Sequence, residues 1–92
     1  MRDLEELRSE IDRIDRELVR LFEERMETVL EVAEYKKENG LPVLNAGRES
    51  VVINKCISCL KNHELDPYLT RWVEYTMVLS KERQEKYLRE NA

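Results

Sequence analysis

Apolar residues recur along the first part of the chain at alternating spacings of three and four positions. This spacing places their side chains along one side of an α-helix, while Glu, Asp and Arg occupy the other sides. The six residues of this apolar seam are Leu4, Leu7, Ile11, Ile14, Leu18 and Leu21. No helix-breaking residue follows until Gly40 and Pro42. The pattern therefore predicts one helix over residues 3–38.

A helix of this length is unusual in a chain of only 92 residues. At about 1.5 Å per residue it extends about 54 Å, which exceeds the diameter of a compact domain of this size. The remaining residues are too few to cover the whole apolar seam, and a short chain buries little surface by itself. We therefore expect part of the helix to pack against a second copy, in a homodimer.

Two shorter helices are predicted in the rest of the chain. The first covers residues 47–61 and has Asn45 as its candidate N-cap. The second begins with Asp66 as N-cap and Pro67 in the first turn, and continues to about Tyr87. No alternating strand pattern or internal repeat is present. We predict an all-α fold with three helices per chain, one long and two shorter.

The charge of the chain limits its partners. Charged residues make up 39% of the composition and the formal net charge is −4. This balance provides no basic surface for nucleic acid or for an anionic membrane. No apolar stretch approaches the roughly 18 residues of a membrane span, and the acidic N-terminus does not resemble a signal peptide. We predict a cytoplasmic protein with no nucleic-acid or membrane partner.

A C-x-x-C pair, Cys56 and Cys59, lies in the second predicted helix, and His63 follows one turn later. A metal site of this type needs a second pair of ligands, and a redox pair usually lies within a βαβ pattern. Neither feature is present in the sequence. We therefore expect no metal and no redox role, and interpret both cysteines as small helix residues.

Two cations interrupt the apolar pattern of the first helix. Arg25 occupies the next seam position after Leu18 and Leu21, and Lys36 follows eleven positions later. At about 100° per residue, both project within about 20° of one direction, about 16 Å apart along the axis. A lone arginine there can also snorkel or set the register. The pair favours a site for a small dianion, because an inward cation without an anion is costly to desolvate.

Arg8 flanks the same seam, about 25 Å from Arg25 along the helix. It is too distant to bind the same small ligand within one chain. In an antiparallel dimer, however, the partner's Arg8 lies beside the other end of the long helix and can complete the site. The alternative is an ordinary solvated charge.

Five segments together resemble the all-helical (AroQ) chorismate mutases over nearly the whole chain. They are Leu7 to Asp15, Glu24-Arg25, Val32 to Lys36, Pro42-Val43 and Arg48-Glu49. The resemblance implies that residues 1–92 are a single chorismate mutase domain in an intertwined homodimer with two active sites. It also implies conversion of chorismate to prephenate in aromatic amino-acid biosynthesis, without a cofactor or a metal.

The resemblance assigns the cations to the substrate. Arg8 of the partner subunit, Arg25 and Arg48 are similar to the residues that hold the two carboxylates of chorismate. Lys36 corresponds to the residue that serves a carboxylate and the ether oxygen.

The remaining assignments fit a Claisen rearrangement, in which negative charge accumulates on the ether oxygen. Gln84 would donate to that oxygen together with Lys36, and such fixed donors stabilise the transition state. Ser80, four residues before Gln84, would lie near the ring carboxylate. Glu49 would accept a hydrogen bond from the ring hydroxyl. A reaction helped by charge and by substrate orientation needs no nucleophile.

Asn45 departs from the family pattern, which commonly has an acidic residue at this substrate-binding position. Because that residue contributes largely through its main chain, we expect asparagine to be tolerated. Two alternatives stay open. One is an isochorismate pyruvate lyase of the same fold. Glu49 disfavours this alternative, because the similar lyases have an apolar residue at the position of Glu49. The other is a non-catalytic helical homodimerisation module.

Overall fold

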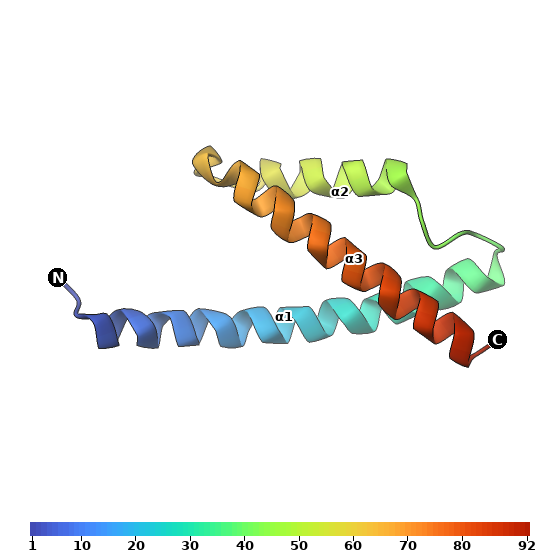
Figure 1. Ribbon diagram of the computed structural model, residues 1–92, viewed down its shortest axis with the longest axis horizontal. Coiled ribbons are helices and arrows are strands. Elements are labelled where there is room, and N and C mark those ends of the chain that lie inside the picture. Colours follow the sequence, from blue (N-terminus) through green and yellow to red (C-terminus); the bar gives the residue numbers. More distant parts are fainter.

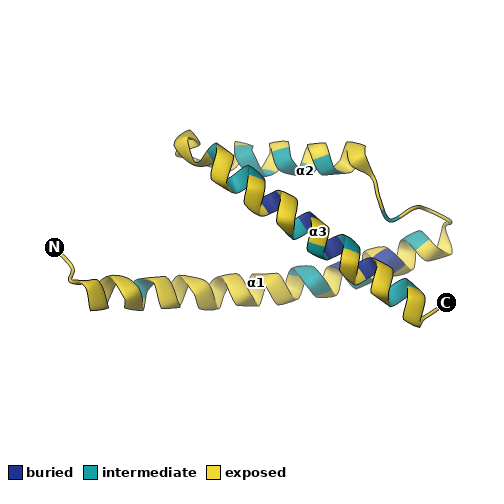
Figure 2. Ribbon diagram, in the orientation of Figure 1, coloured by how far each residue is buried: buried dark blue, intermediate teal, exposed yellow.

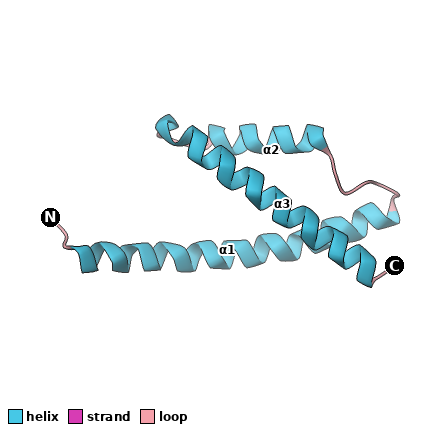
Figure 3. Ribbon diagram, viewed as in Figure 1, coloured by secondary structure: helices cyan, strands magenta, loops and turns pink.

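A computed structural model describes all 92 residues and contains helices and loops without any strand (Figure 3). In chain order the elements are α1 (Leu4–Glu38), α2 (Ala46–Ser58), the 3-10 turn η1 (His63–Leu65) and α3 (Asp66–Glu90). The predicted all-α fold with one long helix is confirmed, although α3 is longer than expected. None of the helices combines the length and the apolar composition that crossing a membrane requires.

Local interactions fix both ends of α1. At its start, the Asp3 carboxylate accepts a hydrogen bond of 2.9 Å from the backbone N–H of Glu6. At its end, Gly40 has a φ of 64°, a left-handed conformation that favours glycine. The next N–H, of Leu41, donates to the carbonyl of Lys36 at 2.8 Å and closes the helix. The predicted extent of residues 3–38 is confirmed to within one residue.

The start of α2 follows the prediction and its end does not. Asn45 is the N-cap, because its side-chain oxygen accepts a hydrogen bond of 3.0 Å from the N–H of Arg48. The helix ends at Ser58 instead of residue 61. The N–H groups of Cys59 and Leu60 donate to carbonyls only three positions back, those of Cys56 and Ile57, at 3.1 and 3.0 Å. The four-residue hydrogen-bond spacing of the α-helix is therefore not continued beyond Ser58.

The predicted N-cap role of Asp66 is wrong. The turn η1 continues directly into α3, so the backbone of Asp66 is already helical, with φ −48° and ψ −50°. An N-cap needs a non-helical backbone. The Asp66 carboxylate instead pairs with Nδ1 of His63 at 2.9 Å. Pro67 lies in the first turn as predicted, and α3 continues to Glu90, beyond the predicted end at Tyr87.

The core lies where α3 crosses the C-terminal half of α1. Helix α3 contacts α1 at this crossing, and its N-terminal half lies beside α2 (Figure 1). Only 6 of the 92 residues are buried, and most of them cluster around this crossing (Figure 2). The buried apolar residues are Val29, Ala33, Val73 and Met77. One chain by itself therefore contains a very small core.

The N-terminal half of α1 has no cover in a single chain. All six residues of the apolar seam are exposed, from 40% for Leu7 to 59% for Leu4. The molecule measures 56 × 26 × 15 Å with a radius of gyration of 16.6 Å, whereas a compact chain of this length has about 12 Å. A continuous exposed apolar stripe of this kind marks an interaction surface.

The cap of α2 gives a stability prediction. Replacing Asn45 with alanine removes the acceptor for the Arg48 N–H, and we expect the free energy of unfolding to fall by about 1 kcal/mol. Urea denaturation followed by circular dichroism, at one fixed chain concentration, measures this change. Asn45→Asp keeps an acceptor and should remain near the wild type. Equal stability of all three proteins would contradict a stabilising cap.

Candidate functional site

An open cleft of about 190 Å³ lies where α1, α2 and α3 meet. Its walls combine apolar and polar side chains from all three helices. Seven of the eight predicted site residues line it: Arg25, Lys36, Asn45, Arg48, Glu49, Ser80 and Gln84. The structure therefore brings together residues that are up to 59 positions apart in the sequence.

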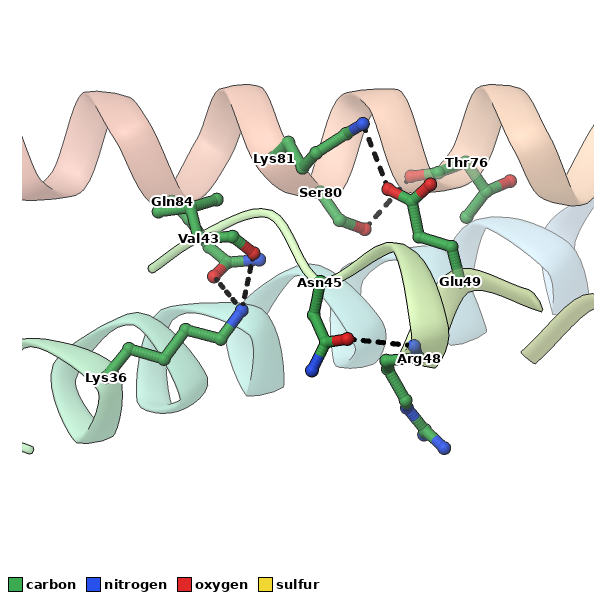
Figure 4. A network of polar contacts seen from close by, with 9 residues as sticks. All are labelled: Lys36, Val43, Asn45, Arg48, Glu49, Thr76, Ser80, Lys81 and Gln84. Carbon is green, nitrogen blue, oxygen red and sulfur yellow. Dashed lines mark hydrogen bonds and ion pairs between the residues drawn. The ribbon is translucent and has the colours of Figure 1, made fainter. Parts of the chain in front are cut away.

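Lys36 extends from α1 toward Val43 and Gln84 (Figure 4). Its Nζ donates to the carbonyl of Val43 at 2.8 Å and to Oε1 of Gln84 at 3.2 Å. An ammonium group has three N–H donors, so one remains for a ligand. Because Oε1 of Gln84 accepts from Lys36, the amide nitrogen of Gln84 is left to donate. The two side chains thus place two fixed donors beside each other.

Ser80 positions the guanidinium of Arg25. Nη1 of Arg25 donates to Oγ of Ser80, and this Oγ donates to the carbonyl of Thr76 at 2.9 Å. Ser80 and Gln84 are each only 6% exposed, and no buried side-chain nitrogen or oxygen lacks a partner. The other N–H groups of the half-buried Arg25 remain available to an anion.

The first turn of α2 contributes Arg48 and Glu49. Arg48 is exposed, and its side chain extends away from Ser80 and Gln84 (Figure 4). No carboxylate of the chain pairs with it. Glu49 points in the opposite direction, and its Oε1 pairs with Nζ of Lys81 at 3.0 Å. Arg48 is therefore a free cation at the edge of the cleft.

Lys81 is a residue of the cleft that the sequence reasoning missed. It follows Ser80 directly and lies three positions before Gln84, so helical spacing places it near the same wall. That spacing was a usable signal. The sequence did not indicate the ion-pair partner of Lys81, because Glu49 belongs to another helix.

The charge of the cleft is opposite to that of the chain. The four cations Arg25, Lys36, Arg48 and Lys81 face a single acid, Glu49, which gives 4 − 1 = +3. The whole chain carries −4. A concave site with this local excess of positive charge is suited to a small dianion.

Arg8 does not line the cleft of its own chain. Its side chain is 62% exposed and pairs with Glu5 at 3.1 Å, near the start of α1. The expectation that it cannot act within one chain agrees with this position. Its contribution to the site of a second copy stays a prediction.

A second hollow, of about 450 Å³, lies along α1 and has a different character. Its lining consists of Arg16, Val19, Arg20, Glu23, Glu24 and Glu27, all from one helix. Arg20 pairs there with Glu17 and Glu24. No other element faces this hollow, so it does not enclose a ligand.

The cysteines lie away from the cleft. Cys56 is half-buried and Cys59 is exposed, and both are free thiols. No group of three or more His, Cys, Asp or Glu side chains is arranged to hold a metal ion.

The fold and the cleft define a class of protein, a small helical protein with a cationic cleft and with fixed hydrogen-bond donors. Residues 7–85 match the family described as chorismate mutase type II, and the chain belongs to this family. This finding confirms the resemblance seen in the sequence. No solved structure is similar enough to the chain to count as a match.

Three relatives illustrate the range of proteins that contain this domain. T-protein of Haemophilus influenzae is 45% identical over 53 residues, which cover 58% of the chain and 14% of that protein. Chorismate mutase of Methanocaldococcus jannaschii is 30% identical, covering 95% of the chain and 89% of that protein. The 4-amino-4-deoxychorismate mutase of Streptomyces venezuelae is 31% identical, with coverages of 70% and 62%. The chain thus spans a small part of one relative and nearly all of another.

Proposed function

We propose that this chain is an isomerase that rearranges chorismate to prephenate, a step of aromatic amino-acid biosynthesis. The observation that carries the proposal is the hydrogen bond between Lys36 and Gln84 in a cleft with a net charge of +3. Membership of the chorismate mutase type II family supports it. So does the match to a chorismate mutase over 95% of the chain.

In the proposed mechanism, the free N–H of Lys36 and the amide nitrogen of Gln84 donate to the ether oxygen of chorismate. Negative charge accumulates on this oxygen as the C–O bond breaks, so donors already in place lower the barrier. Arg25 and Arg48 bind the carboxylates and hold the enolpyruvyl arm over the ring. Neither a nucleophile nor a proton transfer is required.

The other residues of the cleft support this arrangement. Ser80 positions Arg25 near the ring carboxylate, and Glu49 accepts a hydrogen bond from the ring hydroxyl. Asn45 contributes by capping α2, which fixes the turn that carries Arg48 and Glu49. The predicted role of Asn45 in substrate binding is therefore indirect in this proposal.

We further propose that two copies form an intertwined homodimer, in which the partner's Arg8 completes each cleft. The exposed seam supports the dimer, because each of its six apolar residues is at least 40% exposed in one chain. Antiparallel packing of two α1 helices would place the N-terminal half of each helix near the cleft of the other copy. A location in the cytoplasm stays a prediction.

Incubation of the purified chain with chorismate tests the proposed activity. We expect the absorbance of chorismate to fall and prephenate to form as the only product, identified by chromatography. Release of pyruvate from chorismate or isochorismate would favour the lyase alternative. No product from either compound at micromolar protein would contradict an enzymatic role and favour the dimerisation module.

A charge placed in the seam tests the dimer. Leu18→Glu puts two unpaired carboxylates into the proposed interface, one from each copy, and we expect at least about a hundredfold weaker dimerisation. Sedimentation velocity over a range of concentrations measures the change. Leu44→Glu is the matched control, since Leu44 is 56% exposed but lies in the loop before α2. A wild-type chain that remains monomeric at micromolar concentration would contradict the dimer.

A further inference from the structure

The ion pair between Glu49 and Lys81 differs from every other ion pair of the chain. It joins two helices, α2 and α3, and each of its side chains is 31% exposed. The five other ion pairs and the contact between His63 and Asp66 connect residues three or four positions apart, and every side chain in them is at least 38% exposed. Partial burial strengthens a charge pair relative to a fully solvated one. The contact therefore fixes the position of Glu49 in the cleft.

Only one oxygen of the Glu49 carboxylate is used by this contact. Oε1 pairs with Nζ of Lys81 at 3.0 Å (Figure 4), whereas Oε2 accepts no hydrogen bond within the chain. The free oxygen can accept one hydrogen bond from a ligand. The ammonium of Lys81 adds a positive charge close to the same place.

We propose that Lys81 is a positioning and specificity-determining residue, which makes the cleft select a neutral ring hydroxyl over a ring ammonium group. This inference rests on the proposed function, in which Glu49 accepts a hydrogen bond from the ring hydroxyl of chorismate. Alone, the carboxylate would attract a cationic amine more strongly than a hydroxyl. Beside Lys81, its charge is already balanced, and a second cation is repelled.

The chemical probe is 4-amino-4-deoxychorismate, which carries an amino group where chorismate has its ring hydroxyl. An aliphatic amine is predominantly protonated at pH 6.5. Its two carboxylates are the same as those of chorismate, so Arg25 and Arg48 should treat both compounds alike. The difference between the two compounds therefore reports on Glu49 and Lys81.

The test compares the inhibition constant of the amine, measured against chorismate, with the KM for chorismate. We expect Lys81→Gln to lower this ratio about tenfold, because the repulsion is lost while Glu49 keeps its charge. In the same variant, the KM for chorismate should rise more than kcat falls. Lys81→Arg restores the cation and should keep the ratio within about twofold of the wild type.

Arg48→Gln is the matched control for net charge. It removes a cation from the same cleft, but the Arg48 side chain forms no ion pair with Glu49. An unchanged ratio in Lys81→Gln, or an equal fall in Arg48→Gln, would overturn the role of Lys81. If the wild type does not convert chorismate, the proposed function fails. Calorimetry then still tests the role of Lys81, because it compares the affinities for chorismate and for the amine without turnover.

Discussion

Replacement of Lys36 with alanine should lower kcat/KM for chorismate by about 10³-fold while the fold is retained. The loss of one fixed donor to a developing oxyanion typically costs about 10²- to 10³-fold. Lys36 also carries a full charge, and it holds Oε1 of Gln84 at 3.2 Å. Its removal thus releases a second donor from its fixed position. Steady-state rates from the absorbance of chorismate measure the loss.

Lys37→Ala is the control for Lys36→Ala. Lys37 is the next residue of α1, it is exposed, and it donates to the backbone carbonyl of Asn91 outside the cleft. We expect kcat/KM of this variant to stay within about twofold of the wild type, since surface substitutions have small effects. Helical circular dichroism should be unchanged in both variants. A Lys36→Ala protein that retains more than a tenth of wild-type kcat/KM would contradict the proposed mechanism.

The helices of this fold were predictable because their determinants are local. The apolar spacing and the distance to Gly40 and Pro42 define α1 almost to the residue. Helical geometry also placed Arg25 and Lys36 on one side of α1, and Ser80 and Gln84 on one side of α3. All four line the same cleft. Periodicity carries this information because a helix converts sequence spacing directly into direction.

Other features could not be read from the sequence, because they depend on neighbouring segments. Asp66 has the composition of an N-cap, but η1 precedes it and makes its backbone helical. The pairing of Glu49 with Lys81 depends on the approach of α2 to α3, which no local pattern encodes. The proposed role of Arg8 depends on a second copy, which a single chain does not contain.

The seam and the cleft are two parts of one face of α1. The apolar residues from Leu4 to Leu21 lead along the helix to Arg25, and Val29 and Lys36 follow within about 40° of the direction of Arg25. The C-terminal part of this face is covered by α3, and the N-terminal part is exposed. A second copy that covers the seam would therefore also approach the cleft. This continuity links the proposed dimer to the proposed activity.

Mixing two inactive variants should therefore restore activity if Arg8 acts in the other copy. Arg8→Ala and Lys36→Ala each leave a homodimer with two defective sites. A mixed dimer has one site with Lys36 from one chain and Arg8 from the other, and this site is intact. Random exchange of equal amounts gives one half mixed dimers, each with one intact site of two. We expect about one quarter of wild-type activity, as follows from this counting for a two-fold dimer.

The control mixture combines Arg25→Ala with Lys36→Ala. Both residues line the cleft of one chain, so every site of every dimer lacks one of them and no activity should return. Native mass spectrometry of chains labelled with different isotopes shows whether the copies have exchanged. If mixed dimers form and the Arg8→Ala and Lys36→Ala mixture stays inactive, Arg8 does not act in trans. Activity that returns only in the mixture of Arg8→Ala with Lys36→Ala would assign Arg8 to the partner's site. A site built from one chain would stay defective, because each chain of this mixture lacks either Arg8 or Lys36.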